Sequence, residues 1–210
     1  LKLKIRVIGV SNSRQMFFDE NGIDLTNWKE LLKNGEKAGI DSYFSKVSKL
    51  NLRNSVFIDI TANQNVSEMY EAYLRQNIAV VTCNKIACAS SSENYNTLKK
   101  VSRKSNVSFL YETNVGAGLP IIDTLKNLIA SGDRVHKIQA VLSGSLNFVF
   151  NKYDASSTFS AVVKQAAIEG YTEPDPKIDL SGIDVARKIL ILARESGFDK
   201  QSDGHIADHR

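Results

Sequence analysis

Several features that would narrow the function of a protein are missing from this sequence of 210 residues. No apolar run reaches the roughly 18 residues that a membrane-spanning helix needs, and no signal peptide is visible, since the first residues have the pattern of a strand. There are only two cysteines, Cys83 and Cys88. Two thiols without a signal peptide indicate reduced residues in the cytoplasm rather than a disulfide or a metal site. We therefore expect a cytoplasmic protein with no membrane partner.

The charge of the chain is also low and evenly spread. The net charge is +4, and the lysines are scattered among asparagines and serines without a dense basic stripe. Nucleic acid is therefore not an expected partner. With 42% hydrophobic and 24% charged residues, the composition is that of an ordinary globular protein. The length allows one large domain or two small ones with a substantial core.

The glycine-rich turn G-x-G-x-x-G, which holds a pyrophosphate in many nucleotide-binding sheets, does not occur anywhere in the chain. The first part nevertheless alternates short apolar runs with segments of helical periodicity. This alternation predicts a Rossmann-like α/β domain built on a parallel sheet. Strands are predicted at four apolar runs, residues 5–10, 56–60, 78–82 and 107–111, and helices between them at residues 66–75 and 90–105.

The pattern changes after Gly118. Pro120 suits the first turn of a helix whose apolar face includes Ile121 and Leu125, and an alternating strand, two further helices and a polar tail are predicted beyond it. The expected domains are a partial nucleotide-binding domain over residues 1–118, an α+β catalytic and dimerisation domain over residues 119–197, and a disordered tail over residues 198–210. The later elements are a strand at residues 136–142 and helices at residues 159–169 and 182–195.

Three polar loops follow predicted strands, where open α/β sheets bind their ligands. Ser13 and Arg14 follow residues 5–10, and a guanidinium there suits a ribose 2′-phosphate, although the cluster could equally cap a helix. Lys85 follows residues 78–82 and could orient an oxygen near a cofactor or be a surface charge. Glu112 begins the turn ETNVGAG, whose carbonyls could hold a hard cation or merely join a strand to a helix.

Residues 170–188, GYTEPDPKIDLSGIDVARK, gather acidic groups in front of an apolar helix. Ser181 and Asp184 match a capping box, and Asp184 and Lys188 have the spacing of an ion pair on one helix. Because the helix continues as ILILA, we expect it to be buried and Lys188 to be partly desolvated. Burial and a nearby carboxylate shift a lysine pKa in opposite directions, which can tune it for proton transfer. The segment is either an elaborate helix cap or a site for a small, charged substrate.

Four motifs decide between these interpretations: TCNKIA, YETNVGAGLPIIDTL, VLSGSLNFVF and GYTEPDPKIDLSGIDVARK. In this order they closely resemble homoserine dehydrogenase, and the resemblance extends from Ile5 to Gly197. The segments GVSNSR and NGIDLTNW are most similar to the form fused to an aspartokinase, although these residues include no kinase segment. The family's glycine-rich loop and its C-terminal segment are not found either. We therefore expect the middle part of a homoserine dehydrogenase.

The resemblance implies an NAD(P)-dependent oxidoreductase that interconverts L-aspartate 4-semialdehyde and L-homoserine, on the way to threonine, methionine and isoleucine. It implies NADP or NAD as cofactor and a monovalent cation, sodium. Carried over by motif, Lys188 and Lys85 are the catalytic lysines. The other implied residues are Glu173, Asp179 and Asp184 for the substrate, Ser13, Arg14, Thr61, Asn63 and Lys85 for the cofactor, and Glu112 with the carbonyls of Val115, Ala117 and Leu119 for the cation.

One departure affects the substrate residues. Where the family has paired aspartates, this chain has Lys177, Ile178 and Asp179, of which only Asp179 retains the carboxylate. Two alternatives remain open from the sequence. One is a non-catalytic oligomerisation or effector-binding fragment of a bifunctional aspartokinase/homoserine dehydrogenase, and the other is a dehydrogenase for a different amino-acid semialdehyde.

The predicted strand at residues 136–142 also suggests how copies of the chain associate. It and the motif that follows it offer the apolar side chains Ile138, Val141, Phe148 and Phe150. An alternating strand at the edge of a sheet invites pairing with its copy in a two-fold related chain. We therefore expect a homodimer or a higher homo-oligomer.

Overall fold

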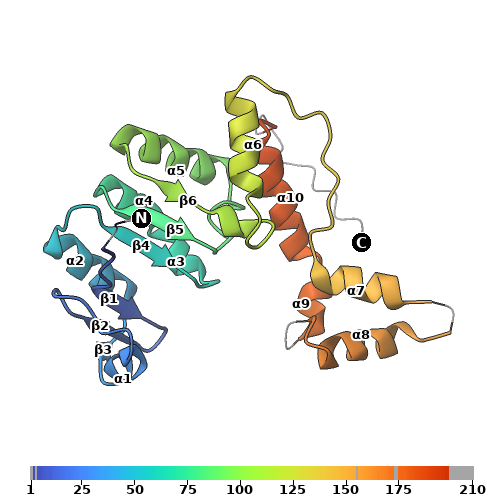
Figure 1. Ribbon diagram of the computed structural model, residues 1–210, viewed down its shortest axis with the longest axis horizontal. Helices are drawn as coiled ribbons and strands as arrows, with labels where there is room; N and C mark the ends of the chain where they lie inside the picture. Colours follow the sequence, from blue (N-terminus) through green and yellow to red (C-terminus); the bar gives the residue numbers. More distant parts are fainter. Residues whose placement is uncertain (1, 3, 155, 173–174, 199–210) are drawn as a thin grey trace.

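A parallel sheet lies at the centre of the structure, a computed structural model shown in Figure 1. Its three strands are β4 (Val56–Asp59), β5 (Ala79–Thr82) and β6 (Phe109–Leu110), hydrogen-bonded in the order β4-β5-β6. Both pairings are parallel, as the alternation of strands and helices predicts. The α/β fold expected from the sequence is confirmed. The residues that the structure describes are 2, 4–154, 156–172 and 175–198.

Short helices connect these strands. The predicted helix at residues 66–75 is divided at Met69 into α3 (Gln64–Glu68) and α4 (Tyr70–Arg75). The side chain of Asn63 accepts a hydrogen bond from Val66 at the start of α3, and Ser91 caps α5 (Ser92–Ser105) in the same way. A helix that the sequence analysis did not predict, α2 (Ile40–Leu50), precedes β4.

The two faces of the parallel sheet differ in burial. On one face Phe57, Val80 and Phe109 are paired in register, and the ring of Phe57 stacks on Tyr73 of α4 with centroids 4.1 Å apart. On the other face, among the described residues, Val56, Ile58 and Leu110 expose 51%, 63% and 46% of their surface. Parallel sheets are usually covered on both faces, so this apolar face lacks the second layer that the fold class normally has.

The first predicted strand does not join this sheet, and that prediction is wrong. The strand is shorter than residues 5–10, and β1 (Gly9–Ser11) pairs antiparallel with β2 (Gln15–Phe18). The cause is local, because the side-chain oxygen of Asn12 accepts hydrogen bonds from the backbone N–H groups of Arg14 and Gln15 and turns the chain back on itself. A third strand, β3 (Glu36–Lys37), completes the separate antiparallel sheet beside α1 (Trp28–Lys33).

Among the described residues after Gly118, the regular elements are all helices. The strand predicted at residues 136–142 is wrong, because this segment pairs with no strand among the described residues. In Figure 1 it runs as an extended connection from α6 to α7. Val149 of α7 packs with Val162 and Ala166 of α8 in a small core of their own. The helices are α6 (Ile121–Ala130), α7 (Gly144–Lys152), α8 (Phe159–Ile168), α9 (Pro176–Leu180) and α10 (Ile183–Glu195).

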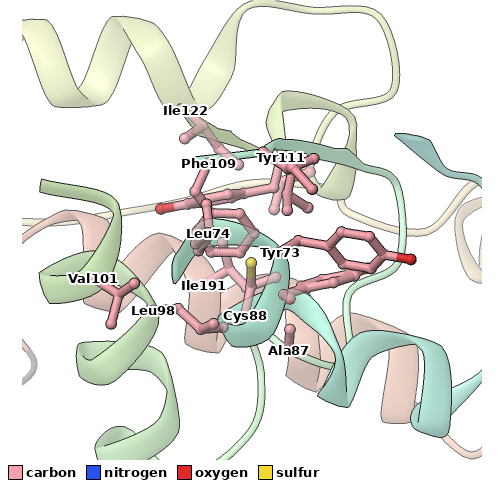
Figure 2. Close-up of a cluster of buried hydrophobic side chains, with 14 of the residues drawn as sticks. Tyr73, Leu74, Ala87, Cys88, Leu98, Val101, Phe109, Tyr111, Ile122 and Ile191 are labelled. Atoms are coloured by element: carbon pink, nitrogen blue, oxygen red, sulfur yellow. The ribbon is translucent and has the colours of Figure 1, made fainter. Parts of the chain in front are cut away.

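The main hydrophobic core crosses the predicted domain boundary at residue 118. Ile122 of α6 and Ile191 and Leu192 of α10 are buried together with the side chains that cover the sheet. Figure 2 shows Ile191 and Ile122 among residues of α4, α5 and the strand ends, including Leu74 and Tyr111. The helix α10 is therefore docked on the sheet, while α7 and α8 extend away from it (Figure 1).

No helix in the described part of the chain has the length and apolarity that crossing a bilayer requires. The predicted tail, residues 198–210, lies outside the described residues except for Phe198.

Candidate functional site

The candidate site lies where the parallel strands end. The carboxyl ends of neighbouring parallel strands meet at one edge of a sheet, which is where open α/β folds bind ligands. Asp59 and Thr82 are partners at the last paired position of β4 and β5. The loops that begin there contain Thr61, Asn63 and Lys85, so three of the predicted site residues start from the same edge.

A buried carboxylate holds the first two of these loops together. Asp59 exposes 2% of its surface and accepts hydrogen bonds from the hydroxyl of Tyr70 at 2.5 Å, the amide of Asn84 at 3.1 Å and the backbone N–H of Thr61 at 2.7 Å. The hydroxyls of Tyr70 and Thr82 are 2.7 Å apart. A buried carboxylate without such partners would be very unfavourable, so these contacts determine the paths of both loops.

The sequence analysis missed Asp59, Tyr70 and Asn84. The available signal was an acidic residue within the apolar run VFIDI, since a carboxylate inside a buried strand requires hydrogen-bond partners. Buried Asn114, which follows β6, joins the same group: in the orientation that satisfies both atoms of its amide, the nitrogen donates to the carbonyls of Thr82 and Cys83 at 3.1 Å each. The amide of Asn84 also donates to the carbonyl of Asn63 at 3.0 Å.

The predicted cofactor residues Thr61 and Asn63 lie in the exposed turn above this network. The hydroxyl of Thr61 accepts a hydrogen bond from the backbone N–H of Asn63 at 3.1 Å, and Asn63 caps α3. The turn thus presents short polar side chains at the carboxyl edge of a parallel sheet. These groups are of the kind that hydrogen-bond a ribose or an amide, so they fit a dinucleotide.

Two lysines from distant parts of the chain share one carboxylate. The Nζ atom of Lys188 lies 2.7 Å from Oδ2 of Asp184, and Nζ of Lys85 lies 3.3 Å from Oδ1. The ion pair within α10 was predicted, but the contact with Lys85 was not. The lysine side chains expose 18% and 26% of their surface, so both are largely sheltered while Asp184 remains half exposed.

The second partner of Lys188 fixes the direction of its side chain. Nζ also donates to the backbone carbonyl of Leu142 at 2.7 Å, just before the segment that forms α7. An ammonium group has three donors, and these two partners use two of them. The remaining donor can be offered to a substrate oxygen. Two cations around one carboxylate leave a net positive charge, which suits an anionic or strongly polarised oxygen.

The charge of Asp184 is stabilised by its neighbours. Burial alone would raise the pKa of this carboxyl group, but the hydrogen bond from Lys188 and the charges of Lys85 and Lys188 hold the pKa below its ordinary value. The predicted capping box is not formed in the expected way, because Asp184 contacts the two lysines while Ser181 accepts a hydrogen bond from Ile183. The carboxylate is therefore part of the charged cluster rather than part of a cap.

The expectation that the whole helix is buried is wrong for its first half. Ile183 and Ile189 each expose 55% of their surface, whereas Ile191 and Leu192 lie in the main core. The face of α10 that carries Lys188 is turned to the sheet, and the opposite face is open. This arrangement leaves Lys188 reachable in the first half of a docked helix.

Asp179 lies in α9, which precedes this helix. Its Oδ1 atom accepts a hydrogen bond from the hydroxyl of Ser145 in α7 at 2.7 Å. This contact ties the SGSLN motif to the acidic segment. Glu173, the other predicted substrate residue before α10, lies outside the described residues.

Glu112 has a structural partner that was not predicted. Its two carboxylate oxygens accept hydrogen bonds from the N–H groups of Ile122 and Asp123 at 2.7 and 2.8 Å, so it caps α6. The following turn has positive φ at Gly116 and Ala117, of 83° and 51°. Such a turn can direct carbonyls to one point, and a carboxylate has further lone pairs, so the fit of a cation is compatible with the cap.

The other residues of the predicted cation set differ in exposure. Val115 is buried, while Leu119 exposes 61% of its surface and its carbonyl accepts a hydrogen bond from Ile121 at 2.8 Å.

Ser13 and Arg14 belong to the antiparallel sheet rather than the parallel one. They form the turn between β1 and β2, and both are exposed. They therefore lie on a different sheet from the strands that precede Thr61, Asn63 and Lys85. An exposed guanidinium at a turn fixed by Asn12 is still a fitting partner for a phosphate.

Comparison with known proteins accounts for both parts of the chain. Residues 2–112 match the family model described as homoserine dehydrogenase, NAD binding domain, and residues 120–204 match the model described as homoserine dehydrogenase. The resemblance drawn from the four motifs is thereby confirmed.

Individual relatives support the same family. The chain is 43% identical over 205 residues to bifunctional aspartokinase/homoserine dehydrogenase 1, chloroplastic, of Arabidopsis thaliana, which covers 97% of this chain and 22% of the relative. It is 39% identical over 190 residues to homoserine dehydrogenase of Schizosaccharomyces pombe, covering 88% of this chain and 50% of the relative. A hyperthermophilic archaeal homoserine dehydrogenase solved in complex with NADPH has a TM-score of 0.77 at 26% identity, over 90% of this chain and 60% of that one. The chain thus spans half or less of these two curated relatives.

The charge of Asp184 predicts how stability depends on pH. Because its folded pKa lies below the ordinary value of 3.8, its contribution is complete above that value and is lost as the pH falls through the folded pKa. We expect Asp184→Asn to lower the urea midpoint at pH 7, and to lower it by less as the pH falls below 3.8.

Urea titrations at several pH values test this. The matched control is Asp123→Asn, which removes a first-turn aspartate paired with Lys126 at 3.9 Å on the more exposed α6. The control should change the midpoint less and with less dependence on pH. A midpoint difference for Asp184→Asn that stays constant down to pH 3 would contradict the lowered folded pKa of Asp184.

Proposed function

This chain belongs to the homoserine dehydrogenase family, and we propose that it carries the catalytic lysines of an enzyme that interconverts L-aspartate 4-semialdehyde and L-homoserine with NAD(P). The observation that supports this most directly is the cluster of Lys85, Asp184 and Lys188. It joins the end of a parallel strand to the first turns of α10. A proton donor is thereby held beside the edge of the sheet where a nicotinamide binds in folds of this class.

The proposed reaction needs two transfers. The nicotinamide, when bound, supplies or accepts a hydride at the substrate carbon. Reduction of the aldehyde leaves a developing alkoxide, which needs a proton or a positive charge within hydrogen-bond reach. Lys188 supplies the proton from Nζ and takes it back in the reverse direction. Asp184 holds Lys188 and Lys85 at their distances, and Lys85 orients the substrate oxygen from the other side.

The remaining family residues take their places around this centre in the proposal. Asp179 and Glu173 hold the substrate's ammonium group, and Asp184 shares in binding its hydroxyl. Thr61 and Asn63 lie along the nicotinamide. The exposed turn above Asp59 and the contact of Asp179 with Ser145 support these roles.

We also propose that a monovalent cation, sodium, binds at the turn after β6. Glu112 and the carbonyls of Val115, Ala117 and Leu119 would hold it. The positive φ angles of Gly116 and Ala117 support a turn of this kind. Here the cation would brace the connection from the sheet to α6.

The wider setting of the chain is a proposal too. The name of the Arabidopsis thaliana relative supports fusion to an aspartokinase in a longer polypeptide. The two cysteines are free, which supports a reducing compartment such as the cytoplasm.

Replacing the proposed proton donor should remove turnover and leave binding intact. We expect Lys188→Ala to lower kcat by about 10²–10⁴-fold, the usual contribution of a general acid–base, with little change in NADPH affinity or stability. Lys85→Ala should also lower turnover but raise the KM for the semialdehyde more. NADPH oxidation with aspartate 4-semialdehyde measures the rate, and NADPH fluorescence measures binding.

The matched control is Lys164→Ala, which removes an exposed lysine from α8. Near-normal turnover of Lys188→Ala, or simple unfolding, would make Lys188 only a structural partner of Asp184. Absence of NADPH binding at millimolar cofactor in a folded protein would favour the non-catalytic alternative, and a panel of semialdehydes separates the related dehydrogenases.

We propose that NADP is preferred over NAD because of Arg14. Its guanidinium is exposed at the turn between β1 and β2, and such a group binds a 2′-phosphate through two parallel hydrogen bonds. Arg14→Ala should weaken NADPH binding at least severalfold and leave NADH binding unchanged. Titrations of both cofactors test this, with the exposed Arg53→Ala as control. An equal loss for both cofactors, or none, rejects the assignment.

We propose a homodimer that forms through residues 136–142. This extended segment exposes Ile138 and Val141 by 43% and 75%, and within the described residues it has no backbone hydrogen bond to a strand. A second copy could satisfy these groups by strand pairing. We expect a dimer by sedimentation and a shift toward monomer for Val141→Lys. Ile168→Lys, at an exposed position of α8, is the control. A monomer at high micromolar concentration refutes the proposal.

A further inference from the structure

A second charged cluster lies at the other end of α10, away from the catalytic lysines. The side chain of Glu195 exposes only 4% of its surface. Its Oε1 atom accepts hydrogen bonds from the hydroxyls of Tyr95 in α5 and Tyr111 after β6. The ammonium of Lys99 lies 3.3 Å from both carboxylate oxygens and donates to the hydroxyl of Tyr111 at 2.8 Å.

All three partners come from the sheet part of the molecule, while Glu195 comes from α10. The sequence separations are 84 to 100 residues, so the cluster is a long-range connection and not a local helix contact. Burial alone would raise the pKa of Glu195, but the charge of Lys99 and the hydroxyls of Tyr111 and Tyr95 hold it below its ordinary value. The carboxylate is therefore charged at neutral pH and must remain with its partners.

The geometry of the helix connects this cluster to Lys188. Seven residues advance an α-helix by about 700°, within about 20° of two full turns, so Lys188 and Glu195 lie on one face about 10 Å apart along the axis. Asp184 lies on this face as well, about one turn before Lys188. Ile191 and Leu192, between the two clusters, are buried in the main core.

Arg194 extends the connection to the other lysine. Its guanidinium donates to the carbonyls of Cys88 and Ser90 at 2.8 and 2.7 Å. These carbonyls belong to the segment that follows Lys85. The contacts at the end of α10 thus fix the rotation of the helix, which carries Lys188. They also fix the position of the segment that follows Lys85.

From this arrangement we infer that Glu195 is a positioning residue for the reaction. Its contacts with Tyr95, Tyr111 and Lys99 set the rotation of α10 and so place Lys188 against Lys85. The inference rests on the proposed function. Among its described contacts Glu195 touches neither Lys85 nor Lys188, so it acts on them through the helix.

Substitution of the carboxylate tests the inference. Because a displacement of about 1 Å can cost on the order of 100-fold in rate, Glu195→Gln should lower kcat roughly 10- to 100-fold. The KM for NADPH should stay within about twofold, since the turn that carries Thr61 and Asn63 is held by Asp59. The control is Glu93→Gln, an exposed glutamate in the first turn of α5.

A purely structural role gives a different pattern. Glu195→Gln would then lower the urea midpoint while kcat per folded molecule remains at the parent value, and that result overturns the inference. Should Glu195→Gln fail to fold, Tyr95→Phe and Tyr111→Phe each remove one hydroxyl donor and keep the ring. A smaller loss of kcat at unchanged KM for NADPH in both supports positioning, and unchanged kcat in both overturns it.

Hydrogen exchange separates this inference from the proposed function. If the parent protein has no NADPH-dependent turnover, the proposed function fails, but the amides of residues 183–188 still report the rotation and docking of α10. Their exchange should be faster in Glu195→Gln than in Glu93→Gln. Equal exchange in the two variants shows that the cluster does not control the first turns of α10 and overturns the inference.

Discussion

Glu195 carries its charge inside the protein, and the way that charge is stabilised constrains the arrangement of the rest of the molecule. A buried carboxylate is tolerated only when hydrogen-bond donors and a cation surround it, and removing one member of such a pair costs about 3–5 kcal/mol. Here the donors are on α5 and at the end of β6, while the carboxylate is on α10. The helix α10 therefore has one favourable position on the sheet. In that position the apolar contacts of Ile191 and the charged contacts of Glu195 are made together.

A second buried carboxylate performs the equivalent task within the sheet. Asp59 receives only neutral donors among its described hydrogen bonds, from Tyr70, Asn84 and the backbone of Thr61. These donors come from separate parts of the chain, namely α4 and the loops that follow β4 and β5. The network therefore fixes these loops relative to the strands. The result is two rigid supports, one beneath the proposed cofactor loops and one behind the lysine helix.

The local elements of the parallel sheet could be predicted from the sequence because burial leaves a clear pattern. The apolar runs that become β4 and β5 are flanked by polar turns, and their order dictates a common carboxyl edge. The run at residues 5–10 has the same composition, yet the turn formed by Asn12 pairs the chain with its own continuation. The alternating segment at residues 136–142 shows the limit of such patterns, because alternation expresses a preference for a strand but does not supply the partner that a strand needs.

In the candidate site, too, some contacts follow from local sequence patterns and others do not. Lys85, Asp184 and Lys188 could be named from motifs, and the helical spacing of the last two predicted their ion pair. The contact between Asp184 and Lys85 spans 99 positions and depends on how α10 is seated, which no local pattern records. The same holds for Glu195, whose partners lie up to 100 residues away. From the sequence alone, Glu195 has the pattern of the solvated end of an amphipathic helix, and only the structure shows that it is buried against Tyr95, Tyr111 and Lys99. The residues proposed to contact ligands can thus be named from their type and order in the sequence, whereas the contacts that hold them in place follow from the three-dimensional packing.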